Sequence, residues 1–220
     1  MSAVASPALA RPPTPDPGRT RLAWLKAQPR APGEASFFWY EPQFGSEAVK
    51  VLPGEYFVAS EDIPIMTTLG SCIAACLWDR RAGVGGLNHF MLPDGDGESG
   101  RYGAFAMELL INTMMKRGAS RGGLEAKVFG GGRVTGGMDT MNVGERNTRF
   151  VLDYLRTERI PVVSKDVLDI YPRKVCFLAA SGKAMVKRLA ATEGVALAAR
   201  EREAARRSDT GDGAGSVDLF

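Results

Sequence analysis

The sequence predicts an α+β or mixed α/β fold in which helices cover a largely antiparallel sheet. Three observations lead to this prediction. Short apolar or β-branched runs bounded by Gly, Pro and Asp are typical of strands, and two longer segments have helical periodicity. The chain has 220 residues, of which 45% are hydrophobic and 24% charged. Such a chain is long enough for one good core and too short for two full domains.

Changes in composition divide the chain into three parts. Residues 1–36 are rich in proline and lack apolar periodicity, so we expect a disordered or loosely attached arm. Residues 37–190 hold the strand and helix patterns and form a single predicted domain. Residues 191–220 begin with an alanine- and charge-rich stretch, so we expect a partly helical, flexible tail.

The two helical segments have apolar residues at intervals of three and four positions. The first stripe consists of Met107, Leu110, Ile111, Met114 and Met115, and Gly118 ends it. The second consists of Phe150, Val151, Tyr154 and Leu155. Strands are predicted in the runs "AVKVLPGEYFVASE", "IPIMTTL", "LEAKVFGGG", "IPVVS" and "RKVCFLAASGKAMVKRL".

The runs "CIAACLWD" and "VGGLNHFML" are expected to pair as a β-hairpin around "DRRAG". If residues 79–82 form the loop, Cys72 lies directly opposite His89 on the same face. A slip of one residue would separate them. The alternative is a helix that begins at Ser71, which would place Cys72 at a helix N-terminus.

Cys72 and His89 could act as a nucleophile and its base. An imidazole beside a thiol can hold the pair as thiolate and imidazolium. The backbone amides near Gly70 and Ser71 could then stabilise an oxyanion. Thr67 or Thr68, just upstream, could orient the imidazole. The competing interpretation is that Cys72 is a small buried strand residue, which is the interpretation favoured for Cys76 and Cys176.

Other functions find little support in the sequence. Lys and Arg are scattered, so no nucleic-acid partner is expected, and no apolar run could span a bilayer. Three cysteines and no signal-peptide pattern argue against a disulfide framework and favour the cytoplasm. No CxxC pair is present, so no metal site is expected.

Several stretches together resemble the CheD family of chemoreceptor glutamine deamidases. They are "LGSCIAACLWD", "GGLNHFMLP", "KVFGGG", "NVGERN" and "RKVCF...SGKAMVKRL". Their order and spacing agree with the family from about Val49 to Leu189. The resemblance implies a three-layer sandwich similar to the catalytic domain of deamidating toxins. The resemblance also implies that residues 37–190 form the catalytic deamidase domain.

The resemblance also implies an activity and a site. The activity is hydrolysis of selected glutamines of methyl-accepting chemotaxis receptors to glutamate, with Cys72 as nucleophile, His89 as base and no cofactor. The family's third residue is a threonine six positions before the cysteine, where this chain has Met66; Thr67 and Thr68 follow it.

Family members include some that remove receptor methyl esters and many that bind a CheC-type phosphatase. Such a protein reaches membrane receptor arrays only through protein contacts. Two other functions stay open from the residues: a binding module that keeps the fold without turnover, and a different cysteine amidohydrolase or protease.

Overall fold

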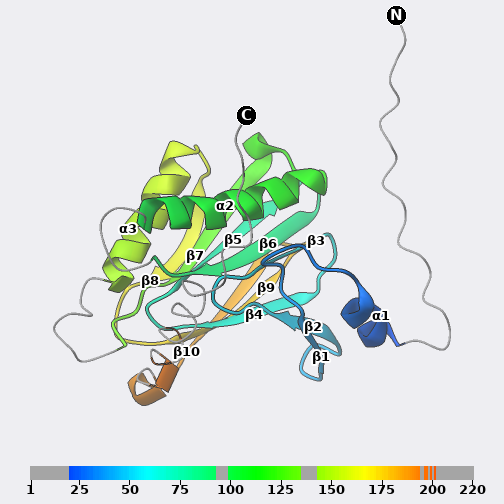
Figure 1. The fold of residues 1–220 in the computed structure, drawn as a ribbon, viewed down its shortest axis with the longest axis horizontal. Coiled ribbons are helices and arrows are strands. Elements are labelled where there is room, and N and C mark those ends of the chain that lie inside the picture. The colour runs from blue at the N-terminus through cyan, green and yellow to red at the C-terminus, as the bar shows by residue number, and fades with distance from the viewer. Residues whose placement is uncertain are drawn as a thin grey trace, which may run out of the picture.

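A computed structural model describes residues 20–92, 99–134, 143–193, 196–197, 199 and 201 as two stacked sheets with helices over one of them (Figure 1). The strands are β1 Phe37–Glu41, β2 Ser46–Lys50, β3 Tyr56–Ala59, β4 Pro64–Leu69, β5 Ile73–Asp79, β6 Val84–Phe90, β7 Leu124–Gly130, β8 Val162–Val167, β9 Arg173–Leu178 and β10 Lys183–Arg188. The helices are α1 Arg21–Ala27, α2 Ser99–Lys116 and α3 Val143–Thr157, with short 3-10 turns η1 Arg121–Gly123 and η3 Ala191–Glu193.

The strands form two five-stranded sheets. One has the order β3-β6-β5-β7-β8 and the other β1-β2-β4-β9-β10; we call them the inner and the outer sheet. All neighbouring strands are antiparallel except β2 with β4 and β7 with β8. The prediction of a largely antiparallel architecture is confirmed, but the sequence patterns did not reveal that the strands divide between two sheets.

Helices α2 and α3 lie across the inner sheet, and the outer sheet lies against its opposite face (Figure 1). The three-layer sandwich that the resemblance implied is therefore confirmed. The predicted stripe of α2 packs onto the inner sheet with four of its five members fully buried, whereas Met115 is exposed. The helix ends where Gly118 adopts a φ of +98°, a left-handed conformation that glycine adopts without strain.

The described residues form two hydrophobic cores, one between the helices and the inner sheet and a second between the two sheets. The second core is formed by alternate side chains of β4, β5, β6 and β9, such as Ile65, Leu87 and Phe177. Cys72 and Cys76 face this layer, as expected for residues four positions apart along an extended chain. The predicted alternative, a helix from Ser71, is wrong, because residues 73–79 form β5.

The β5–β6 hairpin exists, but its register differs from the predicted one by two residues. Asp79 pairs with Val84 and Ala74 pairs with His89, so Cys72 lies diagonally from His89 and not directly opposite it. The difference arises because Asp79 belongs to the strand, and its side chain caps the amides of Arg81 and Ala82 in the turn. A shift of two residues preserves the face, so both side chains still point into the layer between the sheets.

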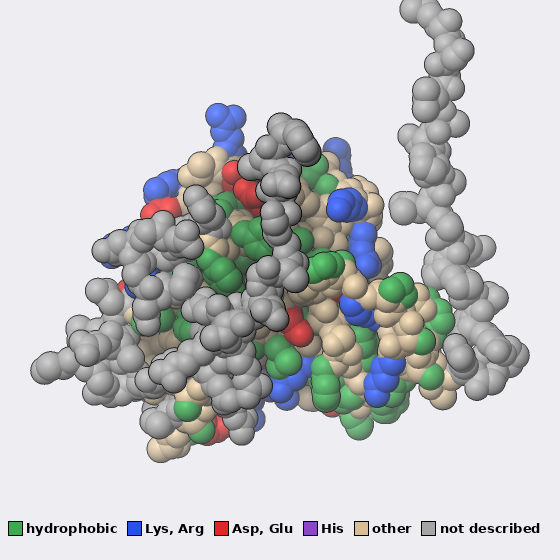
Figure 2. Space-filling view, in the orientation of Figure 1, with side chains coloured by type: hydrophobic (Ala, Val, Ile, Leu, Met, Phe, Trp, Pro, Cys, Tyr) green, Lys and Arg blue, Asp and Glu red, His purple; other side chains and the backbone are tan. Residues whose placement is uncertain are grey.

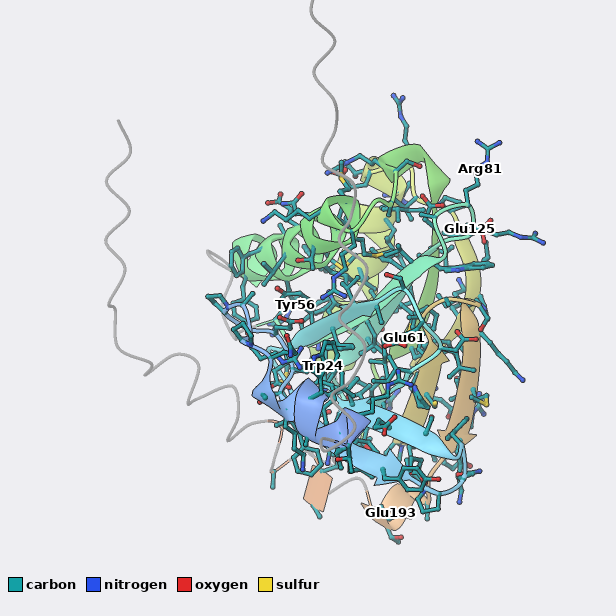
Figure 3. The ribbon with its side chains drawn as sticks, turned by 90° about the vertical axis from the view of Figure 1, so that its right-hand side faces the viewer. Trp24, Tyr56, Glu61, Arg81, Glu125 and Glu193 are labelled. Carbon is teal, nitrogen blue, oxygen red and sulfur yellow. The ribbon has the colours of Figure 1, made fainter. Side chains whose placement is uncertain are left out.

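Part of the expected N-terminal arm is packed on the domain. Residues 21–27 form α1, capped by Thr20, and Leu25 is buried. Figure 3, which labels Trp24, shows α1 on the flank of the sheets. The rest of the arm, residues 1–19, and the tail beyond residue 201 lie outside the described residues.

The surface carries scattered charges. On the face drawn in Figure 2, the visible Lys and Arg side chains are dispersed among other types. Among the helices that the structure describes, none is both long and apolar enough to cross a membrane.

Candidate active site

The predicted nucleophile lies where the chain crosses from one sheet to the other. Strand β4 of the outer sheet ends at Leu69, residues 70–72 make the crossing, and β5 of the inner sheet begins at Ile73. His89 lies near the end of β6, the neighbour of β5. Its backbone is fixed by two hydrogen bonds, from its amide to the Glu55 carbonyl and from the Gly54 amide to its carbonyl.

Thr67 connects the imidazole to the outer sheet. The Thr67 hydroxyl donates to the carbonyl of Val51 at 2.8 Å, and its oxygen lies 2.8 Å from His89 Nδ1. The hydroxyl has a single hydrogen, so its oxygen accepts the bond from Nδ1–H. His89 is thereby held as the tautomer whose Nε2 is unprotonated and able to act as a base. Nε2 has no hydrogen-bond partner among the described residues.

Cys72 lies beside this imidazole. Its Sγ, a ring nitrogen of His89 and a carboxylate oxygen of Glu201 all lie within 4.8 Å of one another. Both predicted residues are buried, Cys72 with 0% and His89 with 2% of its surface exposed. The site is therefore closed in this conformation, and the side chain of Glu201 lies against the pair.

The glycine turn after β7 fixes the backbone of the crossing. The amide of Gly131 donates to the Cys72 carbonyl at 2.8 Å, and the amide of Gly132 donates to the Gly70 carbonyl at 2.7 Å. Gly130 has a φ of +110°, and a Cβ there would overlap the Cys72 carbonyl oxygen. Only glycine permits so close an approach, which explains the "FGGG" stretch that the sequence analysis treated as a strand end.

Asn147 of α3 is a functional candidate that the sequence analysis did not single out. It is fully buried; its Nδ2 donates to the Ser71 carbonyl at 2.9 Å and its Oδ1 accepts from the Leu92 amide at 3.0 Å. It thus ties the crossing to the chain just after β6. Its position within the "NVGERN" stretch was the only signal for it in the sequence.

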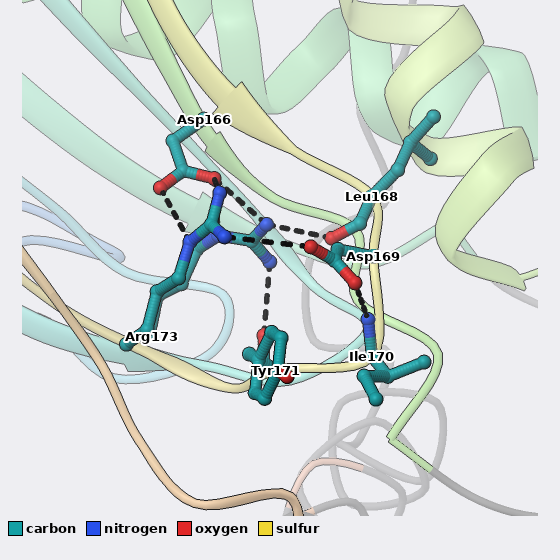
Figure 4. Close-up of polar contacts among 7 residues, drawn as sticks. Asp166, Leu168, Asp169, Ile170, Tyr171 and Arg173 are labelled. Atoms are coloured by element: carbon teal, nitrogen blue, oxygen red, sulfur yellow. Dashed lines mark hydrogen bonds and ion pairs between the residues drawn. The ribbon is translucent and has the colours of Figure 1, made fainter.

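A buried arginine supports the glycine turn from the other side (Figure 4). The Arg173 guanidinium is fully buried and bonds the Asp166 carboxylate and the carbonyls of Leu168 and Tyr171 at 2.6 to 2.9 Å. The Leu168 amide in turn donates to the Gly130 carbonyl at 2.9 Å. Arg173 thereby holds the β8–β9 loop against the turn that positions Cys72.

Glu201, from the expected tail, reaches into the site. Its Oε1 accepts from the Gly70 amide at 2.7 Å, and its Oε2 accepts from the Ser71 amide and the Ser71 hydroxyl, both at 3.0 Å. Its exposed fraction is 1%. The two amides predicted to hold an oxyanion therefore bind a carboxylate. Nothing in the alanine- and charge-rich stretch around Glu201 distinguishes it from the other acidic residues there.

The electrostatics of the closed site favour neutral groups. Burial raises the pKa of the Cys72 thiol well above its usual value, and the carboxylate of Glu201 raises that pKa further. Burial lowers the pKa of the His89 imidazole, an effect that Glu201 opposes. In this conformation the thiol is held protonated, which is its unreactive form.

The remaining predicted residues fall outside this group. Thr68 points to the opposite face of β4 from Thr67, as alternation along a strand requires. Cys76 and Cys176 are buried strand residues, and burial raises the pKa of Cys176 to about 11. Thiolate, imidazole and carboxylate are all zinc ligands, so Cys72, His89 and Glu201 could together hold a metal ion, although the predicted chemistry uses none.

Sequence comparisons with a family model and with named relatives agree with one another. The model of the family described as "CheD chemotactic sensory transduction" matches residues 91–188. A protein of Albidiferax ferrireducens named "Probable chemoreceptor glutamine deamidase CheD 1" is 62% identical over 205 residues, which cover 91% of this chain and 87% of that protein. A relative in Thiobacillus denitrificans, "Probable chemoreceptor glutamine deamidase CheD", is 51% identical over 84% of this chain and 96% of its own. Among solved structures, the hypothetical protein YfiH of Bacillus licheniformis has a TM-score of 0.38 at 10% identity, over 52% of this chain and 51% of that one.

Proposed function

The chain belongs to the CheD family, and on that premise we propose that it hydrolyses glutamine side chains of methyl-accepting chemotaxis receptors to glutamate. The observation that carries the proposal is the set formed by Thr67, His89 and Cys72 beside two amides that bind a carboxylate. A carboxylate is the chemical group that glutamine deamidation produces.

The proposed reaction begins with transfer of the Cys72 thiol proton to Nε2 of His89. The thiolate sulfur attacks the carboxamide carbon, and the amides of Gly70 and Ser71 hold the oxygen as it becomes negative. The His89 imidazolium then protonates the amide nitrogen, the carbon–nitrogen bond breaks, and ammonia leaves a thioester on Cys72.

Water completes the cycle. Nε2 of His89 removes a proton from a water molecule, the hydroxide attacks the thioester carbonyl, and the carbon–sulfur bond breaks. Glutamate leaves, and the proton on His89 returns to the Cys72 sulfur. Throughout both steps Thr67 accepts the Nδ1–H bond, so its role is to orient the imidazole and to stabilise it when it is charged. The chemistry requires neither a metal nor an organic cofactor.

The test incubates the full chain with the cytoplasmic domain of a chemotaxis receptor and follows each glutamine by mass spectrometry. Wild-type protein should convert selected glutamines to glutamate, and Cys72→Ala should convert none. The matched control is Cys76→Ala, which removes a second buried thiol facing the same layer between the sheets and should keep the activity. Undiminished conversion by Cys72→Ala would refute the mechanism.

The same assay separates the alternative functions. A binding module would leave every glutamine intact, and a protease would cleave the receptor backbone. The methylesterase side activity, the CheC-type phosphatase partner and the cytoplasmic location stay predictions from the family resemblance.

A further inference from the structure

We propose that Glu201 is a built-in product mimic: its side chain occupies the subsite for the substrate's glutamine side chain and keeps the enzyme closed until a receptor displaces it. The inference rests on the proposed function, because it identifies the Glu201 carboxylate with the carboxyl group that deamidation forms.

Glu201 carries the same chemical group as the product of the proposed reaction. In the proposed reaction, the product is a glutamate side chain whose carboxyl carbon has just left the Cys72 sulfur. Glu201 is such a side chain, and its carboxylate lies within 4.8 Å of the Cys72 sulfur and of a His89 ring nitrogen. Its two oxygens accept separate bonds from the Gly70 and Ser71 amides. An external glutamine could not place its carboxamide there while Glu201 remains.

The groups around the Glu201 carboxylate fit it closely. A Cβ on Gly70 would lie 2.9 Å from both the Glu201 carboxylate and the Val134 side chain, so glycine at this position gives the carboxylate room to approach the backbone. The Ser71 hydroxyl adds a third donor to the carboxylate. Burying a carboxylate is costly unless it is well hydrogen-bonded, and these three donors compensate for the burial of Glu201. On the other side, His89 Nε2 is buried without a partner among the described residues, as a base awaiting a proton would be.

The nucleophile is also covered. With Glu201 in place, Cys72 has no exposed surface, and the Glu201 carboxylate lies within 4.8 Å of its sulfur. Glu201 therefore suppresses the reaction because it fills the subsite and shields the sulfur from an incoming substrate.

An intramolecular occupant has a definite kinetic signature. It competes with the receptor for the same subsite, at an effective concentration in the millimolar range for a tethered group. Its removal should therefore lower the apparent KM for the receptor and leave kcat unchanged. A residue that takes part in catalysis would instead lower kcat when removed.

The experiment uses the full chain and measures alkylation of Cys72 by iodoacetamide, a reaction that does not require deamidase activity. Glu201→Ala should raise the Cys72 alkylation rate at neutral pH by about tenfold or more, because removal of the carboxylate side chain makes the buried sulfur accessible to the reagent. The matched control is Glu193→Gln, which changes an exposed glutamate in the preceding 3-10 turn. Cys72 of this control should be alkylated at the wild-type rate.

Glu201→Gln provides a second variant that keeps the shape of the side chain, in case the alanine variant does not fold. Only one of the two terminal atoms of the glutamine side chain can accept a bond from a backbone amide, so this side chain binds to the Gly70 and Ser71 amides more weakly. Cys72 of this variant should therefore also be alkylated faster than Cys72 of the wild type. Because the introduced carboxamide lies at the nucleophile, it should also be converted to a carboxylate over time, and the Cys72→Ala background should block the conversion.

The outcomes distinguish this inference from the proposed function. If Cys72 deamidates the receptor but neither variant is alkylated faster than wild type, the deamidase proposal stands and the product-mimic inference fails. The inference also fails if Glu201→Ala lowers kcat, or if the carboxamide introduced by Glu201→Gln persists while receptor glutamines are converted. Faster alkylation in both variants with an unchanged kcat supports it, whichever receptor is used.

Discussion

Replacement of Thr67 by valine tests the hydrogen bond that orients the imidazole. Valine keeps the shape of the side chain and removes the hydroxyl, so His89 Nδ1–H and the Val51 carbonyl each lose a partner at 2.8 Å. Both groups are in a buried setting, since Thr67 and His89 each have only 2% of their surface exposed. The variant should affect stability and catalysis by different amounts.

The magnitudes follow from these two bonds. Each unsatisfied buried group costs about 1 to 3 kcal/mol, so the loss of partners for two groups should lower the free energy of unfolding by about 2 to 6 kcal/mol. The bond to Nδ1–H is stronger once the imidazole is charged, because bonds to charged groups contribute about 1.5 to 3 kcal/mol and bonds between neutral groups about 0.5 to 1.5 kcal/mol. Only the difference, about 1 to 1.5 kcal/mol, lowers the barrier, so at about 1.4 kcal/mol for each factor of ten kcat should fall by about 5- to 12-fold.

The assay combines steady-state deamidation of a receptor domain with nitrogen NMR of the imidazole. The chain has one histidine, so its ring signals need no further assignment. Wild-type protein should show the Nδ1–H tautomer and Thr67→Val a mixture of tautomers, with the loss in kcat and not in KM. Thr67→Ser restores the hydroxyl and should recover most of the rate. A folded Thr67→Val variant with kcat within about twofold of wild type would refute the orienting role.

Two further predictions concern the supports of the site. Gly130→Ala would push a Cβ into the Cys72 carbonyl at a positive φ, so denaturant unfolding should show that the free energy of unfolding falls by about 3 kcal/mol or more. The control is Gly122→Ala, which has open space around it and should change the free energy of unfolding by less than about 0.5 kcal/mol. A stable Gly130→Ala variant would contradict the close approach. Arg173→Met removes the buried partner of Asp166, which keeps its exposed ion pair with Arg188, and takes a donor from the Leu168 and Tyr171 carbonyls, so the free energy of unfolding should fall by about 3 kcal/mol. Burial raises the pKa of Asp166, but hydrogen bonds from Arg188 and Arg173 outweigh burial and hold that pKa below its usual value. The Asp166 carboxylate therefore stabilises the fold above its unfolded-state pKa, and this contribution is lost as the pH falls through its folded-state pKa. Thermal melts of wild type and Arg173→Met should therefore converge as the solution is made acidic, and parallel curves would refute this linkage.

Much of the fold could be predicted because its elements carry strong local patterns. The methionine stripe of α2 and the strands at β4, β7 and β9 are visible as periodic or β-branched runs. The division into two sheets was not predictable, because β2 pairs with β4 past the intervening β3, which joins the other sheet, and β4 pairs with β9 far along the chain. The hairpin register was missed because it depends on whether Asp79 ends the strand or begins the turn.

The candidate site, like the fold, could be predicted only in part. Cys72 and His89 are found by their residue types and by the preserved face of the hairpin, and the structure brings Thr67, not Thr68, to the imidazole. Asn147 and Glu201 could not be found in this way, because each reaches the crossing from a distant segment through ordinary polar side chains. Contacts of this kind leave no periodicity or spacing in a single sequence.

The candidate site is complete only when both sheets are present, since Thr67 comes from the outer one and His89 from the inner one. During refolding, circular dichroism would detect strands as soon as each layer forms, but the imidazole acquires its fixed tautomer only after the two layers dock. Recovery of the proposed deamidase activity would therefore report the docking of the two sheets. A chain arrested before docking would have native-like strands but no activity.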